Sequence, residues 1–327
     1  MHKPFTRFAK PALLKGAAVA AGLALATTSC AATSDDVSSG GSGDETVRMA
    51  VNGWVGYEAS AAVLTHLLEN EMGVDVEQKQ IDEQPSWQGL NDDDLDVIVE
   101  NWGHEDLMKQ YGPEGNGTVV DGGSTGNVGT LGWYLPQYLV DEHPELKTWK
   151  GVKENTDLFK TPESGDKGEF LAADPAFVTQ DQGMINHFDM DLKIVHAGSE
   201  AAQISEMRKR YENEEPYLAY FYEPQWLHNH LDMVHVEFPE YTEGCAENED
   251  DVSCGYPEYD LNKIFRKGFA EEDSPAYRML KNWNWSNADQ DKVATMIADK
   301  GMSAEEAAKS WAEDNKDVWQ EWIPENA

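Results

Sequence analysis

Four aromatic residues that lie far apart in the chain each stand at, or just beyond, the end of a strand-like segment: Trp54, Trp102, Phe177 and Tyr222. In open α/β sheets, ligands bind in the crevice beyond the carboxyl ends of the strands, so these rings could converge on one cleft. Each ring face attracts a cation within about 6 Å, contributing roughly 0.5–2 kcal/mol. A quaternary ammonium group has no N–H that would prefer water, so the pattern predicts a cage for a trimethylammonium head group. Any one ring taken alone could instead be a core residue at a strand end.

The segments that carry these rings alternate between strand and helix patterns. Strands are predicted at residues 47–51, 74–81, 95–99, 130–134, 169–172 and 217–221. Helices are predicted at 59–71, 87–90, 137–141 and 199–213, and over the last sixty residues, where Ser303 and Glu306 form a capping box. This alternation is typical of an α/β fold with largely parallel sheets.

The overall charge excludes several classes of protein. The 327 residues include 61 acidic and 25 basic side chains, which gives a formal charge of −36. A protein that grips phosphate backbones needs an excess of Lys and Arg, so nucleic-acid binding is not expected. No apolar run reaches the roughly 20 residues of a membrane-spanning helix. The acidic excess could draw cations toward the protein, or it could reflect a salt-rich habitat.

The first 29 residues have the layout of a secretory signal peptide. A basic start precedes a short Ala- and Leu-rich run from Gly16 to Ala26, and small residues then lead to Cys30. A Cys in this position resembles a bacterial lipobox, in which the thiol is lipidated and becomes the first residue. We therefore expect a protein anchored by lipid to the outer face of the cytoplasmic membrane, with ordinary cleavage and a leftover thiol as the alternative.

Residues 30–45 read as a flexible tether between this anchor and the folded body. The segment after Cys30 is rich in Gly and Ser and has Val37 as its one larger apolar residue. Removal of residues 1–29 takes away four basic residues, which changes the formal charge from −36 to −40.

Cys245 and Cys254 are the two remaining cysteines. Outside the cytoplasm, two cysteines nine positions apart most simply form one local disulfide, which would here clip an acidic loop. A metal site would need more ligands than these two thiolates.

Two further patterns suggest chemistry but lack the required context. The run Gly122–Gly126 matches G-x-S-x-G, yet a nucleophile elbow needs a strand before it and a helix after it, and a turn-rich segment precedes this run. His228 and His230 could suggest a metal, but no third ligand is placed by the sequence. We therefore expect no catalytic residues, metal site or cofactor. A purely structural lipoprotein is a third class, which would not explain rings at several strand ends.

Several tryptophans are predicted to belong to the core instead. Trp311, Val318, Trp319 and Trp322 fall at helical spacing and read as a buried stripe. Trp283 and Trp285 are assigned to packing as well.

The sequence resembles the glycine betaine/proline betaine substrate-binding proteins of ABC importers and, more broadly, their choline- and carnitine-binding relatives. The resemblance runs from about Thr46 to Pro324. Its most specific segments are VNGWVGYEAS (51–60), LDVIVENW (95–102), LGWYLPQYL (131–139), GSEAAQISEM (198–207) and YFYEPQW (220–226).

This resemblance implies ligand-binding roles for particular residues. Trp102 and Tyr222 match two walls of the family's aromatic cage, and Tyr222 stands where the family usually has Trp. Phe177 matches a third wall by its spacing, Trp54 matches a wall of the choline-binding branch, and Tyr134 is a further candidate wall.

One position departs from the family pattern. Gln225 occupies the His/Tyr place of the family's Trp-x-Pro-His/Tyr-Trp segment, so the donor for a betaine carboxylate could differ here. The sequence therefore leaves betaine, choline, carnitine and proline betaine open as ligands.

The resemblance also implies the architecture and the partners. Such proteins have the type II periplasmic-binding-protein-like fold, in which two α/β lobes are joined by two crossovers and close over a ligand in the inter-lobe cleft. The first lobe is expected to contain residues 46–128 and 233–327, and the second residues 129–232. The implied partners are the permease and ATPase subunits of an importer, and we expect a monomer.

Overall fold

The computed structural model describes residues 45–325. The predicted signal peptide, Cys30 and all but the last residue of the predicted tether lie outside this range. Among the described residues, no helix has both the length and the apolar character that a membrane span requires.

The strands form one mixed sheet, in the order β2-β1-β3-β9-β4-β7-β5-β6, with β8 paired to β4. They are β1 (Thr46–Val51), β2 (Asp75–Gln80), β3 (Val97–Asn101), β4 (Val119–Pro136), β5 (Gly168–Ala172), β6 (Leu192–His196), β7 (Ala219–Glu223), β8 (Met233–His235) and β9 (Glu258–Arg266). The pairs around β1 and β5 are parallel, whereas every pair made by β4 and β9 is antiparallel. The α/β class is thus confirmed, but the sheet is mixed and not largely parallel.

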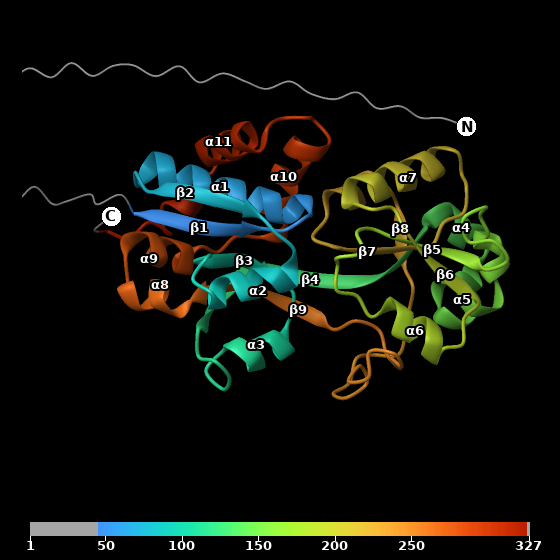
Figure 1. Ribbon diagram of the computed structural model, residues 1–327. Helices are drawn as coiled ribbons and strands as arrows, with labels where there is room; N and C mark the ends of the chain where they lie inside the picture. The colour runs from blue at the N-terminus through green and yellow to red at the C-terminus, as the bar shows by residue number, and fades with distance from the viewer. Residues whose placement is uncertain (1–44, 326–327) are drawn as a thin grey trace, which may run out of the picture. The chain divides into compact units, whose positions relative to one another are not determined.

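Helices cover the sheet on both of its faces (Figure 1). The α-helices are α1 (Val55–Glu71), α2 (Glu83–Asn91), α3 (Glu105–Tyr111), α4 (Gln137–Glu142), α5 (Trp149–Glu154), α6 (Asp181–His187), α7 (Glu200–Glu212), α8 (Lys267–Glu272), α9 (Pro275–Asn282), α10 (Asn287–Ala298), α11 (Ala304–Asp314) and α12 (Lys316–Trp319). Short 3₁₀ turns are η1 (Pro144–Lys147), η2 (Thr156–Phe159) and η3 (Trp226–Asn229).

Two groups of elements lie along this sheet, and they are named here by their central strands. The β1 side contains β1 to β3 with α1 to α3 and α8 to α12, and the β5 side contains β5 to β8 with α4 to α7 (Figure 1). The long strands β4 and β9 pair with each other and join the two sides. Because β9 runs antiparallel inside an α/β sheet, the expected strand–helix alternation does not reveal it.

The start and the buried face of helix α1 depend on its local sequence and on one distant contact. Its predicted apolar stripe, which includes Leu64 and Leu67, is fully buried. The helix begins at Val55, four residues earlier than predicted, although the preceding Trp54 makes no capping bond with its side chain. The backbone N–H of Val55 instead donates to the carboxylate of Glu200, 145 positions away, at 2.8 Å. A distant residue therefore supplies the cap that the local sequence lacks.

The contacts of residues 236–256 place this segment with the β5 side. Val236 N–H donates to the carbonyl of Trp133, and Val252 N–H donates to the carbonyl of Gly183. The disulfide between Cys245 and Cys254 lies within the segment. The chain reaches the β1 side again through β9, which pairs with β3.

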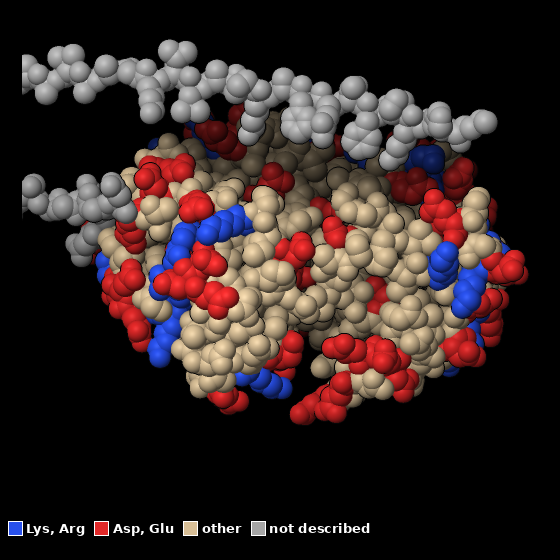
Figure 2. All heavy atoms as spheres, viewed as in Figure 1, with Lys and Arg blue, Asp and Glu red and all other residues tan. Residues whose placement is uncertain are grey.

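The predicted core tryptophans are buried. Trp311 is stacked on Trp322 at a ring-centroid distance of 5.9 Å, and Trp285 meets Trp311 edge to face. The predicted stripe spans two helices, because α11 ends at Asp314 and Trp319 belongs to α12. On the visible surface, Asp and Glu outnumber Lys and Arg over both sides of the sheet (Figure 2).

Candidate ligand-binding site

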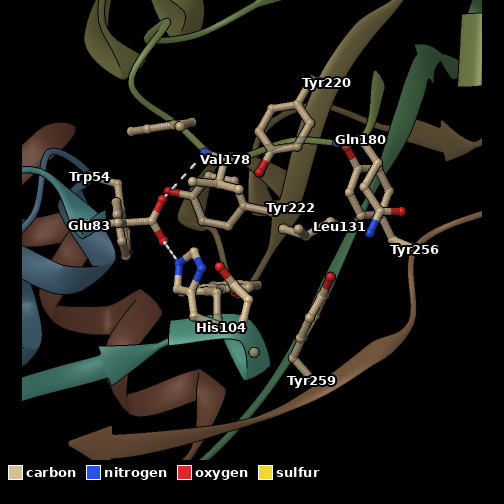
Figure 3. A pocket seen from close by; sticks show the side chains of 14 residues that line it. Trp54, Glu83, His104, Leu131, Val178, Gln180, Tyr220, Tyr222, Tyr256 and Tyr259 are labelled. Atoms are coloured by element: carbon tan, nitrogen blue, oxygen red, sulfur yellow. Dashed lines mark hydrogen bonds and ion pairs between the residues drawn. The ribbon is translucent and has the colours of Figure 1, made fainter. Parts of the chain in front are cut away.

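A cavity of about 180 Å³ lies between the β1 side and the β5 side (Figure 3). Its lining is dominated by aromatic rings, with a few polar side chains among them. The lining residues are Trp54, Glu83, Trp102, Gly103, His104, Asp106, Leu131, Phe177, Val178, Gln180, Tyr220, Tyr222, Tyr256 and Tyr259.

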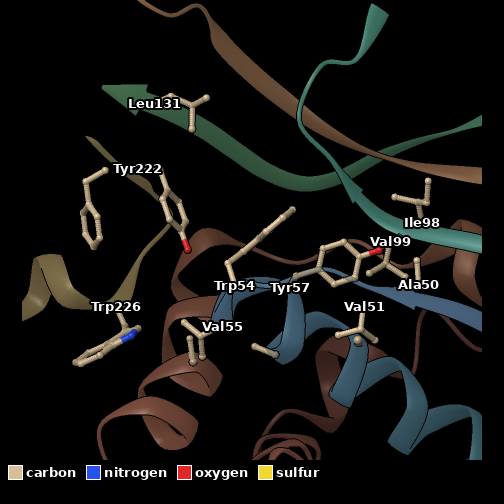
Figure 4. Close-up of a cluster of buried hydrophobic side chains, with 14 of the residues drawn as sticks. Ala50, Val51, Trp54, Val55, Tyr57, Ile98, Val99, Leu131, Tyr222 and Trp226 are labelled. Carbon is tan, nitrogen blue, oxygen red and sulfur yellow. Dashed lines mark hydrogen bonds between the residues drawn. The ribbon is translucent and has the colours of Figure 1, made fainter. Parts of the chain in front are cut away.

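Four of the five predicted cage residues meet at this cavity. Trp54 and Phe177 stand edge to face with their ring centroids 5.7 Å apart, and Trp102 and Tyr222 form a second such pair at 5.7 Å. Each pair takes one ring from the β1 side and one from the β5 side. Figure 4 shows Trp54, which directly precedes α1, and Tyr222 of the strand β7 approaching each other. Edge-to-face pairs are the arrangement that the ring quadrupoles favour.

Tyr134, the fifth predicted wall, does not line the cavity. It is buried on β4, where its ring packs against Phe221, His228 and His235. Leu131 of the same strand does line the cavity. Successive side chains of a strand point to opposite faces, so a residue three positions after Leu131 faces away.

Three tyrosines that the sequence did not single out complete the lining. Tyr220 lies two positions before Tyr222 on β7, and the two-residue period of a strand puts both on one face. That spacing was a signal from which Tyr220 could have been predicted. Tyr259 lies on the unpredicted strand β9, and Tyr256 lies between the disulfide and that strand, so neither could be placed without the sheet.

A buried carboxylate holds the two tryptophans of the predicted cage. Glu100 of β3 is 2 % exposed, and its Oε1 accepts the indole N–H of Trp54 at 2.8 Å and that of Trp102 at 2.9 Å. Its Oε2 accepts Nε2 of Gln290 at 2.6 Å. Burial raises the pKa of Glu100, and these donors act against that rise. The carboxylate therefore fixes the orientation of both rings.

A second buried carboxylate connects the two sides of the sheet. Glu200 is the first residue of α7 on the β5 side, and one of its oxygens accepts the backbone N–H of Val55 at the start of α1. Its other oxygen accepts the hydroxyl of Tyr222 and, at 2.8 Å, Nε2 of Gln225. Burial raises the pKa of Glu200. One carboxylate thus links Tyr222 of the cavity lining to a contact between the two sides.

Asp181 supports a third part of the lining. It is fully buried, and its Oδ1 accepts the indole N–H of Trp133 at 2.7 Å and the hydroxyl of Tyr256 at 2.9 Å. Burial raises the pKa of Asp181 from 3.8 to about 6.

The residues that were considered for metal binding or for a different ligand contact have structural roles. His228 packs on Tyr134, and its Nε2 lies 2.9 Å from the carbonyl oxygen of Tyr222. Gln225 is buried, and its Oε1 accepts the backbone N–H of Leu227. Among residues 45–325, no group of three or more His, Cys, Asp or Glu side chains is arranged to hold a metal ion.

Gly122–Gly126 lies inside β4, without the strand-to-helix turn of a nucleophile elbow.

The geometry favours reversible capture of a cation. Aromatic rings line the cavity and the carboxylate of Glu100 holds two of them, an arrangement that attracts a cation with little need of hydrogen bonds.

Comparison with known proteins places this geometry in context. Residues 45–314 match the family model described as the substrate binding domain of ABC-type glycine betaine transport system. The chain is 25% identical over 281 residues to the trimethylamine N-oxide-binding protein of Pelagibacter ubique, a match that covers 81% of this chain and 87% of that protein. It is 29% identical over 136 residues to the glycine betaine/carnitine transport binding protein GbuC of Listeria monocytogenes, covering 42% of this chain and 41% of that protein.

The fold is shared with a solved structure. Lactococcal OpuAC in its closed-liganded conformation, complexed with glycine betaine, superposes with a TM-score of 0.68 at 22% sequence identity. The superposition covers 86% of this chain and all of the lactococcal chain.

Proposed function

Because the chain belongs to the family of substrate-binding domains of ABC-type glycine betaine transport systems, we propose that its aromatic cavity captures a quaternary ammonium ligand and delivers it to the importer's permease. The family consists of extracytoplasmic binding proteins and not of enzymes. The candidate ligands share a methylated, positively charged nitrogen: glycine betaine, proline betaine, choline, carnitine and, as for the Pelagibacter relative, trimethylamine N-oxide.

The observation that carries this proposal is the convergence of four rings on one cavity, with Glu100 behind two of them. Four rings at roughly 0.5–2 kcal/mol each would contribute about 2–8 kcal/mol. A micromolar Kd corresponds to about 8 kcal/mol, so rings alone reach that affinity only at the upper limit. Hydrogen bonds to the rest of the ligand, and exclusion of water, would supply the remainder.

We propose that the β1 side and the β5 side act as the two lobes of a hinged binding protein, with β4 and β9 as the connections. Two carboxylates support a closed form in which the lobes are in contact. Glu200 on the β5 side accepts a backbone N–H from the β1 side, and Glu83 on the β1 side accepts the backbone N–H of Val178 on the β5 side at 3.4 Å. The two contacts flank the cavity and would break if the lobes separated.

The decisive experiment is isothermal titration calorimetry on cage variants. Trp102→Ala and Tyr222→Ala should each weaken binding of the preferred ligand at least about tenfold, because each removes one wall of the cavity. Tyr222→Trp should preserve or tighten binding, since it keeps a π face and restores the residue that is usual in the family. Unchanged affinity in both alanine variants would overturn the cage.

We also propose that the mature protein is anchored through a lipidated Cys30. A diacylated cysteine carries two chains, which suffices for stable attachment where a single chain is marginal. Cys30→Ser should release the protein from the membrane fraction. Retention of that variant in the membrane would contradict the anchor.

A further inference from the structure

The charged side chains around the cavity are predominantly acidic. Among the fourteen lining residues, Glu83 and Asp106 are carboxylates, His104 is an imidazole, and neither Lys nor Arg is present. A pocket that holds the carboxylate of a zwitterion needs donors or positive charge placed for it.

Glu83 is the acidic group most directly engaged with the cavity. Its side chain is 12 % exposed, its Oε1 lies 3.1 Å from Nε2 of His104, and its Oε2 accepts the backbone N–H of Val178. Figure 3 shows this carboxylate turned into the space that the rings surround. The one imidazole of the lining is therefore already paired with an internal carboxylate.

The N–H and O–H groups of the cage walls are also taken by internal carboxylates. Both indole N–H groups donate to Glu100, and the Tyr222 hydroxyl donates to Glu200. The start of α1 is a natural anion site, because its free backbone N–H groups point outward. There, too, an internal carboxylate is the partner, since Val55 N–H donates to Glu200.

The polar groups left over combine hydroxyls with acceptors, and no Lys or Arg stands among them. The Tyr220 and Tyr259 hydroxyls face the cavity, and hydroxyls can both donate and accept. Oε1 of Gln180 is buried, with no hydrogen-bond partner among the described residues. That oxygen and the carboxylate of Glu83 are acceptors, and both can receive an O–H from a ligand.

We propose that Glu83 is the specificity-determining residue of this cavity and that it selects a quaternary amino alcohol, such as choline, over ligands that carry a carboxylate. This inference rests on the proposed function. A carboxylate brought beside Glu83 meets like charge at short range, whereas an alcohol donates its proton to an acceptor. The cationic head group is attracted in both cases, so the discrimination arises at the other end of the ligand.

The test is a calorimetric titration of the full mature chain with choline and with glycine betaine. The wild-type protein should bind choline at least about tenfold more tightly. In Glu83→Gln, which keeps the size of the side chain but removes its charge, the ratio of the two affinities should fall at least about fivefold. Glu105→Gln, an exposed acid on α3 that does not line the cavity, should leave the ratio unchanged.

The ratio separates a role in specificity from a purely structural one. If Glu83 only held the lobes together, Glu83→Gln would weaken both ligands equally and the ratio would stay constant, which would overturn the proposal. Wild-type affinity for glycine betaine equal to or above that for choline would also overturn it, while leaving the proposed function intact. Absence of binding by any quaternary ammonium compound would overturn the proposed function, and this inference with it. Should Glu83→Gln fail to fold, the wild-type ratio still decides whether the cavity prefers choline, and a fivefold fall of the ratio in Asp106→Asn would overturn the assignment to Glu83 by placing the selection on the other lining carboxylate.

Discussion

Replacement of Glu100 by Gln tests whether the buried carboxylate behind the cage contributes to ligand affinity through its charge. Gln has nearly the same shape, and its side-chain oxygen can still accept the indole N–H groups of Trp54 and Trp102, which now donate to Oε1 of Glu100. The two rings should therefore stay in place while the negative charge is lost. Oε2 of Glu100 accepts from Gln290, so the new amide N–H2 of the variant faces that donor, and the melting temperature should fall without the rings moving.

The expected loss follows from the distance between the charges. A cation seated on the indole faces would lie about 8 Å from the carboxylate, since the N–H···O contacts are short and the cation stays within about 6 Å of each ring centroid. At an effective dielectric constant of about 20, the attraction across that distance is about 2 kcal/mol. Because about 1.4 kcal/mol is a factor of ten, Glu100→Gln should weaken binding roughly thirtyfold.

A neutral ligand provides the control for this measurement. The carbon isostere of choline, 3,3-dimethylbutan-1-ol, has the same shape without the positive charge, so its weaker affinity should be the same for the wild type and for Glu100→Gln. Calorimetry with both ligands separates the charge from any movement of the rings. A change of less than about threefold in choline affinity, or an equal loss for both ligands, would refute the electrostatic reasoning.

The remaining predictions concern closure, pH and stability. Glu200→Gln should weaken ligand binding about tenfold. An amide has a single acceptor oxygen, so it cannot accept both the Val55 N–H and the N–H of Gln225, which now donate to different oxygens of Glu200. Unchanged affinity would count against coupling between the lobes. Asp181→Asn should change the pH dependence of the unfolding free energy. Because burial raises the pKa of Asp181 from 3.8 to about 6, the folded protein binds a proton between these pH values that the unfolded chain does not. In urea titrations, the stability of the wild type relative to the variant should therefore rise by about 2 kcal/mol as the pH falls from 7 to 4. Loss of the disulfide through Cys245→Ser should cost roughly 2–3 kcal/mol of unfolding free energy without abolishing binding, as judged by thermal melts and calorimetry. Trp319→Ala should cost about 3–5 kcal/mol of stability, because that ring is 3 % exposed. The affinity of the folded protein should stay unchanged, because Trp319 lies outside the cavity lining. A loss of affinity would contradict the assignment of Trp319 to the core.

Much of the secondary structure was readable from the sequence because it depends on neighbours within one turn or one strand. The apolar stripe of α1, the Ser199 cap of α7 and the capping box at Ser303 are all present in the structure. Helix periodicity and capping act over three to seven residues, so a local pattern contains the information. Strand β9 was missed because its partners, β3 and β4, are more than 100 residues earlier in the chain.

Four of the rings in the candidate site could likewise be predicted from the sequence. Trp54, Trp102, Phe177 and Tyr222 could be proposed together because parallel strands deliver their carboxyl ends to one edge of a sheet. Tyr134 shows the limit of that reasoning, since a shift of one position along β4 sends a side chain to the opposite face.

Only the tertiary structure decided which acidic residues serve the site. In a chain with 61 acidic side chains, Asp and Glu read as surface residues, and no local pattern marks Glu83, Glu100 or Glu200 as different. Each accepts from a donor that is distant in sequence: Glu83 from Val178, Glu100 from Gln290, and Glu200 from Val55, 145 positions away. A carboxylate becomes costly to bury and strong as an acceptor only once folding removes water from it, so its role arises from the packed environment and not from the residues beside it in the chain.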